Sequence, residues 1–449
     1  MKKNLIVVFL LIACLSRGAE LKVGISATVI TPKPPFWMTG FSSRTTPATG
    51  VLHDVWAKAM VIDDNATGRI IFVTTDLLGL SHEVSEDITT RVIKKYGINR
   101  SQLILSSSHS HSGPVVWPSL SMIFDFDQKD QQAAAQYTQK LTDDIVAVID
   151  TAMSRLVPMQ VWCGHGSTDF AMNRREPTKK GIVNGKNPAG PVDHDVPVLK
   201  IATLDGQLKA VLFGYACHNT TSHEYLFNGD YAGFAQLELQ KMYPGITAMF
   251  FSGCAADQNP QPRGTIELAM QHGKELAEAV QKVLSGELHS VRPPIRTAYA
   301  AADLEFRPFK PETYKKDIQG SDKYIQRRAK LMLEAYNKGW DVSHFSYPVQ
   351  AVRFNKDLTF LAMSNEVVVD YSLKVKKTYS CENLFVAGYC NEVMCYLPSL
   401  RILNEGGYEA NESMIYYGLP GPFADNVEEK VLNAIRCVMK DVGAKRSGR

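Results

Sequence analysis

The stretch QLILSSSHSHSGP, residues 102–114, joins a short apolar run to a polar loop that carries two histidines. The apolar start is typical of a buried strand. His109 and His111 then stand where that strand ends, among serines and just before a glycine and a proline. A simple turn has no need of imidazoles, so the loop is a candidate for chemistry as well as for structure.

Apolar runs, polar loops and amphipathic segments alternate along the rest of the chain. Strands are expected over 69–76, 209–216, 246–252, 358–364 and 383–388, and helices over 85–97, 130–156, 232–243, 267–284, 312–339 and 426–442. This alternation favours an α/β fold with mixed sheets flanked by helices. No internal repeat and no linker is evident, so residues 20–442 are expected to form one domain.

Five polar residues directly follow runs of the strand type: Asp76, His109, His218, Asp257 and Glu366. Ligands in sheet-based enzymes bind outside the carboxyl ends of strands, where loops converge. The pattern therefore predicts a common site. Plainer interpretations stay open, because Asp76 is also typical of a helix cap, His218 of a satisfied buried histidine and Glu366 of a loop carboxylate.

Two histidines and a carboxylate suit zinc. Catalytic zinc sites commonly hold three protein ligands and keep one position open for water, whose pKa the metal lowers to roughly 7. The candidate ligands here are more than a hundred residues apart, and the chain has no HExxH motif. Spacing by itself therefore identifies no metal site.

The composition excludes several classes of protein. The 449 residues are 45% hydrophobic and 21% charged, with a net charge of +3. Such a chain can bury a large core, and it shows no basic stripe for nucleic acid. Seven of the eight cysteines follow Cys14, and they form no CxxC pair. No disulfide framework is expected at this size, and Cys390 and Cys395 are interpreted as buried free thiols.

The first residues, MKKNLIVVFLLIACLSRGAE, predict export, because two lysines precede an apolar run too short to span a bilayer. Residues 1–19 are either a lipoprotein signal, in which LIAC is a bacterial lipobox and Cys14 becomes acylated, or an ordinary signal peptide cleaved near Gly18 or Ala19. Both predict a periplasmic, outer-membrane or secreted protein. An acylated Cys14 would add contact with a membrane surface.

Several motifs follow one another along the chain in this order: LKVGISATVITP, SSHSHSGP, ACHNTTS, AADQNP, LAMSNEVVVDYS and VAGYCNEVMCYLPS with EGGYEANES. Together they resemble the neutral/alkaline non-lysosomal ceramidase family, over about residues 21–425. The resemblance implies a ceramidase-like zinc hydrolase catalytic domain. It also implies a zinc ion held by His109, His218, Glu366 and Tyr396.

Further roles are implied by the same resemblance. His111 would orient the zinc ligands or face the substrate. Tyr408 matches a family tyrosine that faces the reacting carbonyl, and Arg174 matches an arginine of the active-site cleft. Ordinary packing stays open as an interpretation of the tyrosines.

The sequence departs from the family pattern in two motifs. The family's GDxSP motif, whose serine is proposed to attack the amide, reads ADQNP here, with Asn259 at the serine's position. Asparagine cannot form an acyl-enzyme, but it can donate a hydrogen bond to a developing oxyanion. Asp257 of this motif is kept as a candidate catalytic residue. Asn365 replaces the glycine before Glu366, and we expect no C-terminal β-sandwich domain of the kind that full-length members carry.

Three functions fit these observations. The first is a secreted or lipid-anchored zinc hydrolase that cleaves an amide bond of an N-acyl compound such as ceramide, in sphingolipid metabolism. The second is the same scaffold acting on an ester or a carbohydrate-derived substrate, and the third is a non-catalytic surface binding protein. The stretch VVWPSLSMIFDF, 115–126, either lines a lipid cleft or belongs to the core. A deep apolar slot beside His109 would indicate acyl chains, and a wide polar bowl would indicate sugars.

Overall fold

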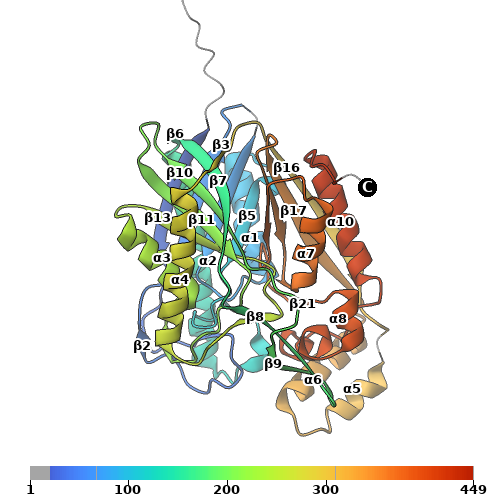
Figure 1. Cartoon of the computed structure of the whole chain (residues 1–449). Helices are drawn as coiled ribbons and strands as arrows, with labels where there is room; N and C mark the ends of the chain where they lie inside the picture. Colours follow the sequence, from blue (N-terminus) through green and yellow to red (C-terminus); the bar gives the residue numbers. More distant parts are fainter. Residues whose placement is uncertain (1–20, 67, 309, 448–449) are drawn as a thin grey trace, which may run out of the picture.

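Three mixed β-sheets, each covered by helices on its outer side, surround a shared apolar core (Figure 1). The computed structural model describes residues 21–66, 68–308 and 310–447. The expected signal segment with Cys14 lies outside the described residues. The expected α/β class, with mixed sheets flanked by helices, is confirmed.

Each sheet contains the same succession of four strands. The first sheet contains Lys22–Val29 (β1), Trp56–Asp63 (β3), Arg69–Thr75 (β4) and Leu103–Ser107 (β5). The second contains Gln160–Ser167 (β7), Asp195–Ala202 (β10), Leu208–Tyr215 (β11) and Thr247–Ser252 (β13). The third contains Ile295–Glu305 (β16), His344–Phe354 (β17), Leu358–Met363 (β18) and Leu384–Ala387 (β20).

The pairing of these strands is also the same in each sheet. The first three strands pair antiparallel in chain order, and the fourth lies parallel to the third. A helix makes each parallel crossover: His82–Tyr96 (α1), Asp230–Met242 (α3) and Val369–Thr378 (α7). The structure thus repeats one topology three times, although no internal repeat is evident in the sequence. Different apolar residues can form the same strand pattern, so topology repeats where the sequence does not.

The inner faces of the three sheets meet in one core. Phe360 on β18 packs against Phe72 on β4 and against Phe251 on β13, with ring centroids 5.1 Å apart in both pairs. The crossover helices and the helices Gln128–Ser154 (α2), Ile266–Ser285 (α4) and Val427–Asp441 (α10) cover the outer faces. Figure 1 shows α3 and α4 on one side of the molecule and α7 and α10 on the other.

Smaller elements connect this frame to the site. They are the hairpin Ala171–Thr178 (β8) and Gly181–Asn187 (β9), Gln258–Pro260 (β14) beside β8, and the parallel pair Glu366–Val367 (β19) and Tyr396–Leu397 (β21). Short helices follow at Leu400–Glu405 (α8) and Met414–Tyr417 (α9), with a π-helical turn, Tyr408–Glu412, between them.

One expected helix is divided in two. The sequence predicts continuous helix over 312–339, but the structure has Pro311–Asp317 (α5) and Lys323–Lys338 (α6). The chain turns around Gly320, and Asp322 then starts α6 by accepting hydrogen bonds from the backbone N–H groups of Tyr324 and Ile325. An aspartate at this position favours the start of a new helix, because its carboxylate accepts hydrogen bonds from first-turn N–H groups that have no acceptor within the helix.

Candidate metal-binding and active site

The loops at the carboxyl ends of the third and fourth strands of each sheet converge on one place. His218 lies three residues after β11, and Glu366 lies three residues after β18. Leu78 holds the same position after β4. His109 lies two residues after β5, and Tyr389 two residues after β20. The repeated topology therefore explains why residues so distant in sequence meet.

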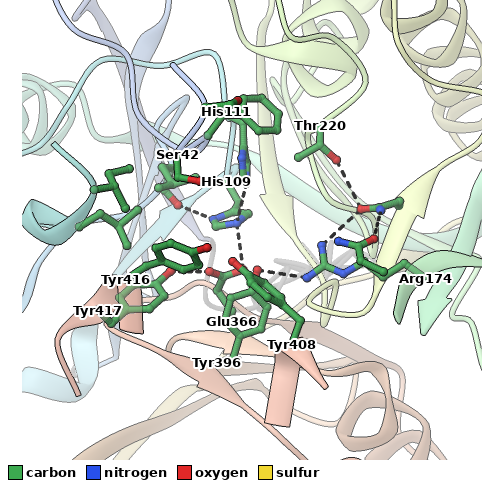
Figure 2. A pocket seen from close by; sticks show the side chains of 18 of the residues that line it. Ser42, His109, His111, Arg174, Thr220, Glu366, Tyr396, Tyr408, Tyr416 and Tyr417 are labelled. Atoms are coloured by element: carbon green, nitrogen blue, oxygen red, sulfur yellow. Dashed lines mark hydrogen bonds and ion pairs between the residues drawn. The ribbon is translucent and has the colours of Figure 1, made fainter. Parts of the chain in front are cut away.

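The expected ligands lie within a few ångströms of one another, and Figure 2 shows three of them, His109, Glu366 and Tyr396, around one point. Glu366 Oε2 lies 3.1 Å from His109 Nε2 and 3.2 Å from His218 Nε2. His218 Nε2 also lies 3.4 Å from the hydroxyl of Tyr396, and His109 Nε2 lies 3.2 Å from His111 Nε2. The side chains of Glu366, His109 and His218 are almost fully buried.

The tautomers of two histidines follow from their outer hydrogen bonds. His109 Nδ1 lies 2.7 Å from the carbonyl oxygen of Leu78, and His218 Nδ1 lies 2.7 Å from that of Ala255. A carbonyl oxygen only accepts, so each Nδ1 carries the proton and the neutral ring keeps a lone pair on Nε2. Metal-ligating histidines commonly make this type of outer hydrogen bond.

Three electron-rich atoms therefore face one another. They are the two Nε2 atoms and Glu366 Oε2, which receives no hydrogen bond from the described residues. Such atoms repel at about 3 Å unless a proton or a metal cation lies between them. Two imidazole nitrogens and a carboxylate oxygen form a donor set that zinc accepts, so these residues fit the metal that the resemblance implies.

The ionisation states are consistent with this donor set. Burial lowers the pKa of His218 to about 4, and nearby Arg174 contributes to the shift. Burial opposes ionisation of Glu366, and its pKa lies well below the usual range only where a positive charge faces its oxygen, as on protonated His109 and His218. A metal ion between a neutral imidazole and the carboxylate would supply that charge, and these are the forms that bind metal ions.

Arg174 organises one side of the site. Its guanidinium donates to Glu409 Oε1 at 2.7 Å, to the hydroxyl of Tyr396 at 3.2 Å and to Asn259 Oδ1 at 3.4 Å. It also lies 5.7 Å from the ring centroids of Tyr396 and Tyr408. Arg174 is thus paired with Glu409, which also accepts from Arg175, and the remaining donors of Arg174 fix a tyrosine and an asparagine of the site.

Two aspartates from the strand-end pattern take other positions. Asp257 does not line the cavity, since its oxygens accept from the backbone N–H of Val369 at 2.8 Å and from Asn173 Nδ2 at 3.1 Å. Asp76 accepts from the N–H of Trp56 at 3.0 Å and from Gln236 Nε2 at 2.9 Å. Asp257 therefore holds the start of α7, and Asp76 joins β3 to α3.

A cavity of about 270 Å³ opens beside the histidines. Its lining combines polar and aromatic side chains with three aliphatic ones, Leu78, Leu120 and Ile123. Two of these belong to the stretch 115–126, so part of that stretch borders the cavity. The lining matches neither an apolar slot nor a purely polar bowl. His111, Asn259, Tyr408 and Arg174 all border the same space.

Sequence reasoning missed several neighbours of the site. The hydroxyl of Tyr417 donates to Glu366 Oε1 at 2.5 Å. Phe41 packs on His111 with ring centroids 4.8 Å apart, and Arg44 donates to the carbonyl oxygen of His111. Leu78 contributes a backbone carbonyl. A backbone contact leaves no signal in residue type, and no pattern distinguishes Tyr417 from a packing tyrosine.

The replacement of glycine by Asn365 has a local explanation. Asn365 adopts a left-handed conformation with φ +66°. Asparagine is among the few residues with a side chain that tolerate this region. Its Oδ1 also accepts a 2.6 Å hydrogen bond from the backbone N–H of Met394. The departure from the family motif therefore preserves the turn that presents Glu366.

The expectation for the cysteines near the site is confirmed. Cys390 and Cys395 are both buried, and neither forms a disulfide. Burial raises the pKa of the Cys390 thiol to about 12.

Within the described part of the chain, no helix has the length and apolar content needed to cross a membrane.

Comparisons with known proteins agree with the motifs. Residues 22–284 match the family model described as neutral/alkaline non-lysosomal ceramidase, N-terminal. The neutral ceramidase of Pseudomonas aeruginosa is 28% identical over 242 residues, which are 50% of this chain and 34% of that protein. The neutral ceramidase of Drosophila pseudoobscura pseudoobscura is 23% identical over 268 residues, 56% of this chain and 38% of that protein. The aligned part thus spans little more than a third of these relatives.

Solved structures share the fold over a longer stretch. The crystal structure of the Pseudomonas aeruginosa neutral ceramidase superposes with a TM-score of 0.72 at 18% identity, covering 96% of this chain and 76% of that one. A structure described as ceramidase complexed with C2 gives the same TM-score and identity and is covered to 77%.

Proposed function

The chain belongs to the neutral/alkaline non-lysosomal ceramidase family, and from this premise we propose that it is a zinc-dependent hydrolase that cleaves the amide bond of an N-acyl compound. The observation that carries the proposal is the meeting of two Nε2 atoms, on rings whose Nδ1 atoms face backbone carbonyl oxygens, with a carboxylate oxygen in a buried site. The proposed metal holders are His109, His218, Glu366 and Tyr396.

His111 has a different proposed role although it lies close to the same point. One potential ligand atom each from His109, His111 and His218 lie within 4.8 Å of one another. The Nδ1 of His111, however, has no hydrogen-bond partner among the described residues, whereas Nδ1 is fixed in both other rings. Burial and the neighbouring histidines lower the pKa of His111, so the ring is neutral. His111 is therefore proposed to accept the proton of the attacking water.

The remaining residues position the substrate and steady its charge. A bound zinc ion would supply Lewis acidity and a water of lowered pKa. Because Asn259 cannot be acylated, water attacks the carbonyl directly. The Asn259 amide and the Tyr408 hydroxyl border the cavity and are proposed to donate to the developing oxyanion, which is worth several kcal/mol in a dry site. Arg174 acts through Tyr396 and Asn259, both of which it holds.

A second candidate is hydrolysis of an ester or a carbohydrate-derived substrate on the same scaffold. The polar residues in the cavity lining, among them Thr220, Asn184 and Asn259, favour it. A non-catalytic binding role is the third candidate, although a binding protein has no physical need for the complete donor set.

The cellular location of the protein and the bounds of its catalytic domain are proposals as well. Export by residues 1–19, with or without acylation of Cys14, would bring the protein to the periplasm, the outer membrane or the exterior. Residues 20–442 are proposed as one catalytic unit.

The test measures metal and activity together. The purified protein is assayed for zinc by mass spectrometry, before and after chelation. It is then assayed against an N-acyl sphingosine, an acylated sugar and a simple carboxylic ester. We expect bound zinc and chelator-sensitive release of fatty acid from the amide. Active protein without a divalent ion, or zinc-loaded protein that cleaves none of the three, would contradict the proposal, and preference for the ester or the sugar would favour the second candidate.

A further inference from the structure

Two arginines line the cavity, and they differ in how their charge is balanced. Arg174 is paired with Glu409. Arg263 also lines the cavity, but it makes no hydrogen bond or ion pair with any residue that the structure describes. Its side chain is partly buried. An arginine in such a position loses hydration without gaining a protein partner.

The backbone around Arg263 is fixed. The N–H of Gln261 donates to the carbonyl oxygen of Phe170 at 2.8 Å, and the N–H of Gly264 donates to that of Thr221 at 2.7 Å. Arg263 follows Asn259 by four residues and also borders a neighbouring hollow with Lys186. The guanidinium is therefore presented from a tethered segment next to the proposed oxyanion donor.

The surroundings leave this charge without a carboxylate. Burial and the nearby Arg174 lower the pKa of Arg263, so two guanidinium groups share one region. Glu366 is the only acidic residue among the described side chains that line the cavity. Its Oε1 accepts from Tyr417 and its Oε2 faces the histidines, so it is not available to Arg263. The lining of the cavity therefore offers Arg263 no free carboxylate, and a bound anion would supply one.

The apolar part of the lining lies on another side. Leu120 and Ile123 belong to a segment whose 3₁₀ turn, Ser121–Ile123, packs against α9, which carries Tyr417. Figure 2 shows Tyr416 and Tyr417 on one side of Glu366 and Arg174 and Thr220 on the other. The cavity thus has an edge near α9 and, across Glu366, an edge that carries Arg174, whose charge also acts on Arg263.

We infer that Arg263 binds an oxyanion of the substrate, so that the preferred substrates are N-acyl compounds whose amine portion carries a carboxylate, sulfonate or phosphate. The acyl group then lies toward Leu120 and Ile123, and the scissile amide lies at the histidines. This inference rests on the proposed amide hydrolysis. A guanidinium matches all three oxyanions because each offers two oxygens to its planar donor pairs.

The test uses one acyl chain on four amines. The zinc-loaded protein is assayed with N-decanoylglycine, N-decanoyltaurine, N-decanoylethanolamine phosphate and neutral N-decanoylethanolamine. We expect kcat/KM for at least one anionic substrate to exceed that for the neutral one by about tenfold or more, because charge-assisted hydrogen bonds have that strength. The first three substrates also show which oxyanion is preferred.

Variants assign the preference to one residue. Arg263→Gln should remove the preference for anionic substrates and leave hydrolysis of the neutral one within about twofold. Lys180→Gln removes the same charge from the exposed tip of the β8–β9 hairpin and should keep the preference. Equal rates for charged and neutral substrates in the unmodified protein, or a preference that survives Arg263→Gln, would overturn the inference.

A binding measurement separates this inference from the proposed function. Calorimetry with the chelated protein and N-decanoylglycine needs no hydrolysis. Binding that weakens about tenfold in Arg263→Gln but not in Lys180→Gln supports the role of Arg263 even if no amide is cleaved. Undetectable binding, or equal binding by both variants, counts against it.

Discussion

His218 and Glu366 hold equivalent positions in two different sheets, and the Nε2 of the one lies 3.2 Å from the Oε2 of the other. Each follows the third strand of its sheet by three residues. Three sheets of the same topology direct the carboxyl ends of their strands toward a common point, so the chain assembles the site by repetition. Leu78, at the third such position, contributes its carbonyl oxygen to His109.

Loss of one imidazole should abolish metal binding. His218→Ala removes a nitrogen donor that faces Glu366, and zinc affinity should fall by at least about 100-fold, with activity lost in parallel. Competition with a chromophoric chelator measures the affinity. His289→Ala changes an exposed histidine on an edge strand and should bind zinc normally. Full zinc occupancy of His218→Ala at equal concentration would remove His218 from the ligand set.

The hydroxyl of Tyr417 should tune the metal site without joining it. Tyr417→Phe deletes the hydrogen bond to Glu366 Oε1, and such losses commonly weaken metal binding by roughly 10–100-fold. Tyr416→Phe is the matched control, because Tyr416 lines the same cavity without a hydrogen bond to Glu366. Indistinguishable zinc affinities of the two variants would show that the Tyr417 hydroxyl has no such role.

Asp257 should make stability depend on pH. Burial raises its pKa from 3.8 to about 7, although the N–H of Val369 opposes the shift. The folded state therefore keeps a proton that the unfolded state releases, so this carboxyl's stabilising contribution is present below pH 3.8 and is lost as the pH rises through about 7. Over that window the unmodified protein should lose up to about 4 kcal/mol relative to Asp257→Asn.

Urea unfolding of both proteins at several pH values between those limits measures this difference. A constant difference in the free energy of unfolding across the window would show that Asp257 titrates in the folded state as it does in the unfolded state.

The stability of the protein should depend on which small residue occupies position 365, in the left-handed turn before Glu366. Asn365→Ala imposes a side chain that disfavours φ +66° and deletes the acceptor for Met394 N–H, so the free energy of unfolding should fall by about 2 kcal/mol. Asn365→Gly loses the same acceptor but adopts the turn freely, so it should be less destabilised. Thermal and denaturant unfolding measure both variants, and a glycine variant less stable than the alanine variant would contradict this account.

The sequence by itself determined most of the strands and helices and the positions of the candidate metal-binding residues. Alternating apolar and amphipathic runs predict the strands and helices, because side-chain periodicity is a local property. The polar residues after those runs include His109, His218 and Glu366, which the structure brings together. Asp76 and Asp257 also follow strand-type runs but lie outside the site. The end of a strand in the sequence does not show which residues the next side chain contacts.

Only the tertiary structure decided the rest. The packing of three sheets on one core places the Leu78 and Ala255 carbonyls against two imidazoles and so fixes which nitrogen faces Glu366. It also brings Tyr417 to the carboxylate and leaves Arg263 without a partner among the described residues. These contacts join segments separated by tens to hundreds of residues, and their geometry depends on how whole sheets pack, which no short-range pattern of residue types records.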